Sequence, residues 1–198
     1  MALHLVIFGR QGAGKGTQSQ RIVDAYGVVH VSTGDMLRAA IAAETEMGLA
    51  AQKIMDAGGL VDDTTMIGIV SERLAQSDIV ERGVLLDGFP RTPTQAEELV
   101  RILGDRSIDA AINLEVSVEE CTARMLDRGR DDDTEEAIVK RLNLYESQTR
   151  PLLEWFEDRG LLLEVPGMGA EDEVFARVRT ALDASIAGDE VGEGDNGE

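Results

Sequence analysis

The sequence has few of the residues that stabilise small secreted proteins or form membrane segments. Its 198 residues include one cysteine, Cys121, so we expect neither an internal disulfide nor a cysteine-based metal site. No apolar run approaches the roughly 18 residues that a membrane helix needs. The start, MALHLVIFGRQGAGKG, lacks a basic segment and an A-x-A cleavage site, which indicates a buried strand entering a glycine-rich loop rather than a secretory signal. These absences predict a reducing, cytoplasmic location.

Basic residues are scarce as well. The chain has 19 Lys+Arg against 38 Asp+Glu, a net charge of −19, and its lysines are Lys15, Lys53 and Lys140. This balance argues against nucleic acid or an anionic membrane as a partner, because both require a basic face. A salt-adapted source and GC-rich codon usage both explain such a composition, and the sequence leaves the two open. An anionic substrate must therefore be held by a local cluster of positive charge.

Apolar runs alternate with helical patterns along the chain. Its length suits one compact α/β unit with small inserted lobes. Strands are predicted at residues 3–8, 28–31, 84–86, 110–116 and 161–165, and helices at 15–26, 34–57, 64–76, 95–103, 117–126, from 134 with a kink or end at Pro151, and 171–186. The alternation predicts a parallel sheet with ligands beyond the carboxyl ends of its strands. Residues 188–198 are acidic and glycine-rich, which predicts a disordered tail.

The strongest local motif runs from Gly9 to Thr17, between a predicted strand and a predicted helix. Its spacing, G-x-x-x-x-G-K, matches the loop that cradles phosphates with backbone N–H groups, with Lys15 as a point charge. The alternative is a glycine-rich turn with an incidental lysine, but the strand before and the helix after favour the phosphate loop. Asp87 ends an apolar run. Alone, such an aspartate could simply mark the end of a strand. Beside a phosphate loop, the interpretation that Asp87 orients hydrated Mg²⁺ is favoured.

Three motifs, in this order, resemble those of the adenylate kinase family of nucleoside monophosphate kinases. They are GAGKGTQ at residues 12–18, STGDMLR at 32–38, and DGFPRT at 87–92 followed by Gln95. The resemblance extends over about residues 3–182. In this family a glycine after the lysine is normal, so Gly16, where other phosphate loops carry Ser or Thr, supports the likeness.

The resemblance implies an α/β, three-layer P-loop kinase fold with a five-stranded parallel sheet. One domain would cover residues 1–187, with a nucleoside-monophosphate-binding (NMP-binding) segment at 32–62 and a very short lid at 128–134. The implied activity is reversible transfer of a phosphoryl group, ATP + AMP = 2 ADP, in adenine nucleotide homeostasis. Mg²⁺ would enter with ATP, no zinc is expected, and the enzyme would be a monomer.

The same resemblance assigns roles to individual residues. The catalytic residues would be Lys15, Arg91, Arg128, Arg130 and Arg141. ATP would be bound by Gly12, Ala13, Gly14, Lys15, Gly16, Thr17 and Arg124. AMP would be bound by Thr33, Arg38, Val61, Gly88, Arg91, Gln95, Arg130 and Arg141, and Asp87 would orient Mg²⁺ through water.

Two positions depart from the family. Gln11 replaces the usual proline, which we expect to alter loop stiffness rather than chemistry. Gly129 alone separates Arg128 from Arg130, where relatives have a longer lid, so the roles of these arginines remain open.

Some side chains also allow a structural interpretation. The arginines at 124, 128 and 130 could form a solvated helix end, and the aspartates at 131–133 could simply cap the next helix. His4 and His30 lie on predicted strands and are interpreted as structural. Cys121 is interpreted as a small buried hydrophobe, and Trp155 and Phe156 as packing residues.

Rival functions are distinguishable from the sequence. A UMP/CMP kinase would carry alanine in place of Thr33 and asparagine in place of Gln95, and neither is present. A nucleotide-binding switch without catalysis should lack part of the arginine set. A purely structural acidic protein leaves the phosphate loop unexplained.

Overall fold

A five-stranded parallel sheet forms the centre of the molecule. The computed structural model describes residues 2–130 and 133–192. The strands are β1 (Leu3–Phe8), β2 (Val29–Ser32), β3 (Gly83–Asp87), β4 (Ala110–Glu115) and β5 (Leu162–Pro166), and their order is β2-β3-β1-β4-β5. β1 lies in the middle, with Leu5 opposite Leu85 of β3 and Ile7 opposite Ile112 of β4. The predicted sheet is therefore confirmed.

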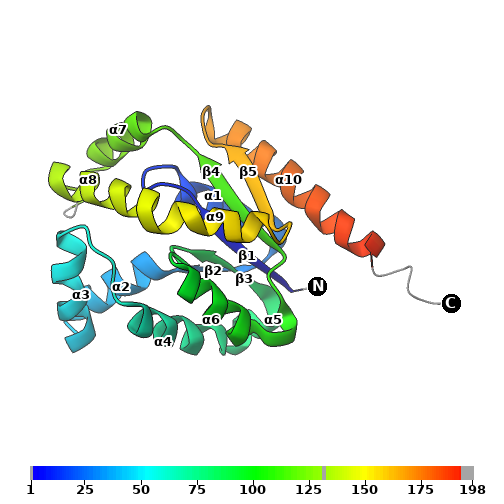
Figure 1. The fold of residues 1–198 in the computed structure, drawn as a ribbon, viewed down its shortest axis with the longest axis horizontal. Coiled ribbons are helices and arrows are strands. Elements are labelled where there is room, and N and C mark those ends of the chain that lie inside the picture. Colours follow the sequence, from blue (N-terminus) through cyan, green and yellow to red (C-terminus); the bar gives the residue numbers. More distant parts are fainter. Residues whose placement is uncertain (1, 131–132, 193–198) are drawn as a thin grey trace.

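Helices cover both faces of this sheet (Figure 1). They are α1 (Lys15–Tyr26), α2 (Thr33–Ala42), α3 (Glu46–Asp56), α4 (Asp63–Leu74), α5 (Ser77–Arg82), α6 (Pro93–Leu103), α7 (Val118–Arg128), α8 (Glu135–Leu144), α9 (Arg150–Glu157) and α10 (Glu171–Gly192). A 3₁₀ turn spans Gly104–Arg106 and a π-helical turn spans Tyr145–Thr149.

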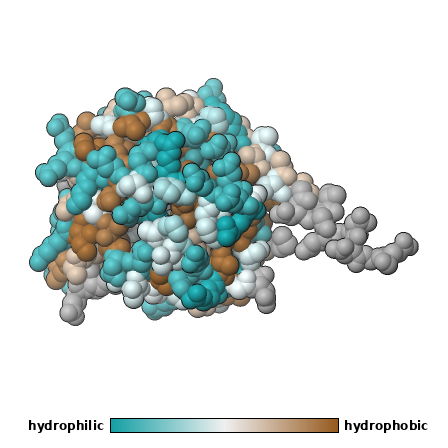
Figure 2. Space-filling view, in the orientation of Figure 1, coloured by the Kyte–Doolittle hydropathy of each residue, from teal (hydrophilic) through white to brown (hydrophobic). Residues whose placement is uncertain are grey.

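Alternation along the strands builds two cores. Leu5 and Ile7 of β1 pack with α1, α7 and α10, whereas Val6 and Phe8 pack with α4, α6 and α9. Successive side chains of a strand point to opposite faces, so a fully apolar strand serves both cores. The protein therefore has three layers, with the sheet between two layers of helices. On the face seen in Figure 2, hydrophilic residues cover most of the surface and apolar residues form separate patches.

Two helical patterns differ from the sequence prediction. The helix expected at 34–57 is two helices, because Thr45 starts α3 by accepting a hydrogen bond from the Gly48 N–H at 3.0 Å. A Cβ on Gly48 would lie 2.1 Å from the Ala40 carbonyl oxygen, so α2 and α3 pack too closely there for any other residue. The short helix α5 was not predicted.

Two helix ends differ from the prediction, and the helix is irregular next to Pro151 as expected. The helix after residue 134 is capped by Thr134, which accepts from the Ala137 N–H, and not by Asp133. It widens into the π-helical turn just before Pro151, which has no N–H to continue the α-helical ladder. α10 continues to Gly192, so residues 188–192 of the expected tail are helical, and 193–198 lie outside the described residues. One glycine costs a helix only about 1 kcal/mol, which does not end it.

Substitution of Phe156 tests the packing of the core that contains Val6 and Phe8. It is fully buried, and its ring lies 5.1 Å from that of Phe8, centroid to centroid. We expect Phe156→Ala to lower the free energy of unfolding by about 3–5 kcal/mol, through lost burial and a residual cavity. Urea unfolding measures this. Leu126→Ala, at a residue that is 49 % exposed, serves as control and should change it by less than about 0.5 kcal/mol. Equal losses in the two variants would contradict the core assignment.

Candidate active site

A cavity of about 460 Å³ opens where the carboxyl ends of β1, β2 and β3 meet. The predicted site residues that line it are Gly12, Gly14, Lys15, Gly16, Thr17, Thr33, Arg38, Val61, Asp87, Gly88, Arg91, Gln95, Arg124, Arg128, Arg130 and Arg141. Ala13 is the exception: its side chain is buried in the core with Cys121 and Met125. The structure thus brings together residues from segments far apart in the sequence, while their individual roles stay predictions.

The phosphate loop is fixed by glycine geometry. Gly12 has φ +85°, and a Cβ there would lie 2.4 Å from the Cys121 carbonyl oxygen, so the loop touches the backbone of α7. Gly14, with φ +93°, precedes α1 without any side-chain cap. The N–H groups of the first turn of α1 therefore have no intrahelical acceptor, and they present the positive end of the helix dipole to an anion.

Lys15 is half-buried at the base of this loop. Its Nζ donates to the carbonyl oxygens of Gly9, at 2.8 Å, and Arg10, at 3.2 Å. Burial lowers the pKa of Lys15, and the nearby charge of Asp87 acts in the opposite direction. The ammonium group is thus held between the loop and a carboxylate, within reach of the cavity that both line.

Asp87 ends β3 next to the phosphate loop and beside His30 of β2. Burial raises its pKa, but His30 and Lys15 outweigh that effect, so the pKa of Asp87 lies below its usual value and the group is a carboxylate. The His30 Nε2 lies 3.6 Å from Oδ2 of Asp87. The sequence interpretation of His30 as merely structural missed this contact. An ionised oxygen ligand beside a phosphate site fits the preference of Mg²⁺.

Thr33, Gly88 and Arg91 contact one another on the other side of the cavity. The Thr33 hydroxyl donates to the Asp87 carbonyl oxygen at 3.4 Å, and Arg91 Nε donates to the Gly88 carbonyl oxygen at 2.8 Å. Gly88 has φ +86°, and a Cβ there would lie 2.7 Å from the Thr33 hydroxyl. Only glycine therefore fits between these two side chains. Arg38 pairs with Asp35 at the mouth of the same region.

Gln95 uses both ends of its carboxamide inside the protein. Its Oε1 accepts from the Arg91 N–H at 2.8 Å and its Nε2 donates to Asp63 at 2.7 Å. A carboxamide has two N–H donors and an oxygen with two lone pairs, so one donor and one lone pair remain for a ligand. Asp63, which sequence reasoning missed, fixes the orientation of this group.

The carboxylate of Asp133 pairs with arginines from the predicted short lid, residues 128–134, and from α8. Its carboxylate accepts from Arg128 Nε and Nη2, both at 2.9 Å, from the Arg130 N–H at 3.3 Å, and from Arg141 Nη1 at 3.1 Å. Burial raises the pKa of Asp133, but the bidentate Arg128 outweighs this and the pKa is lowered. Asp133 therefore pairs with arginines instead of capping the next helix. The neighbouring aspartates, 131 and 132, lie outside the described residues.

Arg141 and Gly58 join the predicted NMP-binding segment, residues 32–62, to α8. Arg141 Nη2 donates to the Met55 carbonyl oxygen at 3.1 Å. A Cβ on Gly58 would lie 2.8 Å from the Ala137 carbonyl oxygen. The two sides of the cavity therefore touch at this point, where α3 and α8 face each other in Figure 1. Arg124 completes the charged wall and pairs with Glu120 at 2.8 Å.

This arrangement suits phosphoryl transfer. A helix N-terminus, a half-buried lysine and several arginines surround one cavity, and the ionised carboxylate of Asp87 lines it as well. Such groups position phosphates and stabilise the charge of the transition state, which is most of what the reaction requires of a protein. The fold and the cavity together define a P-loop phosphotransferase.

Comparison with known proteins specifies the family. The family model described as adenylate kinase matches residues 7–161. The chain is 44 % identical to the adenylate kinase of Bacteroides thetaiotaomicron over 187 residues, which covers 91 % of this chain and 98 % of the relative. It is 45 % identical to that of Nitrobacter hamburgensis, covering 96 % of each, and 46 % identical to that of Maricaulis maris, covering 91 % and 99 %. The chain belongs to the adenylate kinase family.

The structure also bears on membrane spans and metal sites. Within residues 2–130 and 133–192, no helix combines the length and apolar character that crossing a bilayer requires. The same residues contain no group of three or more His, Cys, Asp or Glu arranged to hold a metal ion. The expected lack of zinc stays a prediction.

Asp133→Asn tests whether the buried carboxylate organises the cavity. The variant keeps the shape but removes the charge that pairs with Arg128 and Arg141. We expect a loss of about 3–5 kcal/mol in the free energy of unfolding, because a buried guanidinium loses its partner, together with a lower kcat/KM. Urea unfolding and steady-state kinetics measure the two effects.

Asp78→Asn provides a matched control for this variant. Asp78 also forms a bidentate pair, with Arg73 at 2.8 Å and 2.8 Å, but on the surface and outside the cavity. Surface pairs contribute little, so stability and kinetics should both stay close to those of the unaltered protein. If Asp133→Asn behaves like this control, Asp133 does not organise the site.

Proposed function

We propose that the protein catalyses reversible, Mg²⁺-dependent phosphoryl transfer, ATP + AMP = 2 ADP. The observation that carries the proposal is that one cavity contains both a phosphate loop and a second polar region built from Thr33, Arg38, Arg91 and Gln95. Two nucleotides can then meet with their phosphates between Lys15 and the arginines. Membership of the adenylate kinase family supports the same reaction.

The donor ATP binds at the phosphate loop. The residues from Gly12 to Thr17 surround its β and γ phosphates, Lys15 neutralises part of their charge, and Arg124 lies along the nucleotide. Asp87 orients Mg²⁺ through water, and the cation supplies further charge neutralisation on the phosphates. The lowered pKa of Asp87 supports this role because the group remains ionised.

The acceptor AMP binds on the opposite side. Arg38 and Arg91 hold its phosphate, since a guanidinium fork suits paired phosphate oxygens. Thr33 and Gln95 face its base, and Val61 and Gly88 border it. Arg128, Arg130 and Arg141 lie around the group in transfer.

No side chain has to remove a proton. The second ionisation of a phosphate monoester lies near about 6, so the attacking oxygen is already an anion at neutral pH. Catalysis then consists of alignment and charge stabilisation in a site that excludes water. The contact of Arg141 with the Met55 carbonyl oxygen supports a cavity that can close between the NMP-binding segment and α8.

The proposal includes the domain layout and the surroundings of the enzyme. One domain spans residues 1–187, with the NMP-binding segment at 32–62 and the short lid at 128–134. The partners are ATP, AMP and ADP, and the enzyme acts as a cytoplasmic monomer without nucleic acid or membrane. The net charge of −19 supports the exclusion of polyanionic partners.

The choice of base gives the sharpest test of this function. The free donor and lone pair of Gln95 complement the exocyclic amine and N1 of adenine, and Thr33 adds a hydroxyl. A bidentate base contact discriminates by about 1–3 kcal/mol. We therefore expect kcat/KM for AMP to exceed that for CMP, UMP and GMP at least about tenfold. A coupled assay with ATP and each acceptor measures this.

Gln95→Ala should lose most of the preference for AMP while the KM for ATP stays unchanged. Asp63→Asn is the control, because asparagine can still accept the hydrogen bond from Gln95 Nε2 and should keep the preference. If the unaltered protein uses CMP or UMP better than AMP, the proposed reaction is wrong and only the family remains.

A further inference from the structure

Gln11 occupies a turn position that favours a different residue. The Ala13 N–H donates to the Arg10 carbonyl oxygen at 3.0 Å, which closes a four-residue turn with Gln11 second and Gly12 third. The φ of +85° at Gly12 is typical of a type II turn, in which proline suits the second position. Gln11 donates no main-chain hydrogen bond to a backbone carbonyl of the described residues. The backbone therefore has no need of glutamine.

The side chain of Gln11 lies among the groups that handle phosphate. It lines the main cavity, and it also lines a smaller adjoining one of about 60 Å³. Lys15, Arg91 and Arg141 line both cavities as well. Gln11 is thus situated where the donor side and the acceptor side of the site meet.

The carboxamide of Gln11 is not satisfied within the protein. Its Oε1 is buried and has no hydrogen-bond partner in the part of the chain that the structure describes. Gln95, in the same cavity, has partners for both ends of its amide. Buried polar atoms are nearly always paired, and an exception inside an active site indicates a role there.

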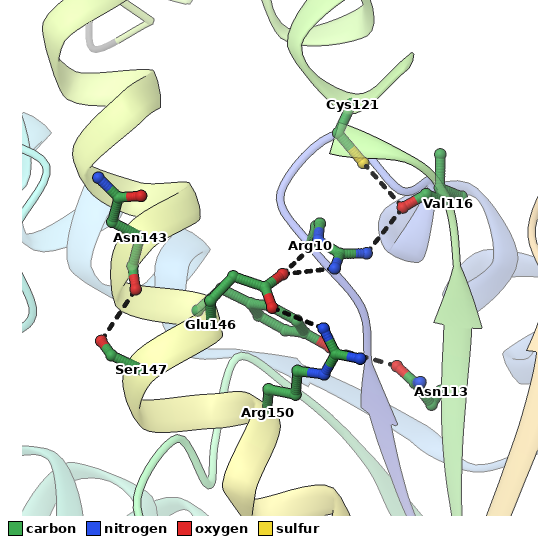
Figure 3. A network of polar contacts seen from close by, with 9 residues as sticks. Arg10, Asn113, Val116, Cys121, Asn143, Glu146, Ser147 and Arg150 are labelled. Atoms are coloured by element: carbon green, nitrogen blue, oxygen red, sulfur yellow. Dashed lines mark hydrogen bonds and ion pairs between the residues drawn. The ribbon is translucent and has the colours of Figure 1, made fainter. Parts of the chain in front are cut away.

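Arg10 holds the turn in place from outside the cavity (Figure 3). Its Nη1 donates to the Val116 carbonyl oxygen at 2.9 Å and its Nε to Glu146 Oε1 at 2.7 Å. Glu146 also accepts from Arg150 at 2.9 Å, and the Arg10 guanidinium lies 5.6 Å from the ring centroid of Tyr145. Arg10, the first residue of the turn, is therefore anchored to the segment between β4 and α7 and to the π-helical turn. This anchoring supplies rigidity that proline would otherwise give.

We propose that Gln11 is a further catalytic residue, whose amide donates a hydrogen bond to the phosphoryl group in transfer. The inference rests on the proposed function. In the step, the bond between the γ phosphorus and the oxygen bridging it to the β phosphate breaks, and a bond from a phosphate oxygen of AMP forms. No proton moves, and the Gln11 N–H remains on nitrogen. The Oε1 of Gln11 accepts an N–H of a neighbouring arginine when the site fills.

This role differs from that of the cations around it. Lys15, Arg91 and Arg141 bring charge and can only donate. A neutral carboxamide donates and accepts at once, so it can align the transferring group against a guanidinium without adding repulsion between cations. That repulsion is real in this site, because Arg141 and Arg38 both act to lower the pKa of Arg91, after burial, which is the largest cause.

Gln11→Pro separates catalysis from loop stiffness. Proline fits the second position of the turn and stiffens it, but it has no amide side chain. If Gln11 only shapes the loop, this variant keeps its kcat. If Gln11 contacts the transferring group, kcat falls about tenfold or more, as for other lost transition-state donors, while the thermal midpoint stays the same or rises.

The experiment measures kcat, both KM values and thermal midpoints with ATP and AMP. Gln11→Pro and Gln11→Leu should both lower kcat about tenfold or more, with each KM little changed. Gln11→Glu should be slower still because its carboxylate repels phosphate. Gln20→Leu, at an exposed residue of α1 that bonds only Asp24 in the described structure, is the matched control and should keep wild-type kinetics.

Two outcomes would overturn the inference. One is that Gln11→Pro and Gln11→Leu retain the wild-type kcat. The other is that only a KM rises, since the contact would then stabilise the bound ground state and the transition state equally. Failure of the proposed function is separate from both, because it appears as absence of transfer from ATP to AMP in the unaltered protein.

Discussion

The buried carboxylate of Asp133 holds two guanidinium groups side by side, and the charged half of the cavity depends on it. Its side chain has no exposed surface, and it pairs with Arg128 and with Arg141. Without such a group, cations from α7 and α8 would repel one another and separate. Because its pKa is lower in the folded chain, Asp133 contributes stability at neutral pH, and that contribution is lost as the pH falls through the folded-state pKa. A chain of net charge −19 thereby keeps a local positive site.

The parallel sheet supplies the remaining groups from its carboxyl edge. β1 leads into the phosphate loop, β2 into Thr33, and β3 into Asp87 and Gly88. Ser32 at the end of β2 lies opposite Asp87 in the sheet, so the residue proposed to orient Mg²⁺ and the proposed acceptor region are neighbours by register. Close backbone approach then fixes their spacing, since a Cβ on Gly88 would collide with the Thr33 hydroxyl. The fold thus determines how far apart these side chains lie in the cavity.

The sequence predicts features that are carried by contiguous residues. The phosphate loop, the five strands and the motif beginning at Asp87 depend on local pattern, and each lies where it was expected. Contacts between distant segments carry no such pattern. The sequence does not show that His30 meets Asp87, that Asp63 orients Gln95, or that Arg10 reaches Glu146 across 136 positions. The division of the helix at 34–57 likewise depends on packing of α2 against α3, which periodicity does not reveal.

In the proposed reaction this cavity passes a phosphoryl group from one nucleotide to another and excludes water. Phosphorus NMR of ATP, AMP and Mg²⁺ with the purified protein tests it most directly, because each species is followed separately. We expect ATP and AMP to disappear in equal amounts, two ADP to appear for each pair, and no inorganic phosphate to form. If inorganic phosphate forms and ADP does not increase by two per ATP, or if the spectrum does not change, the proposed reaction is contradicted.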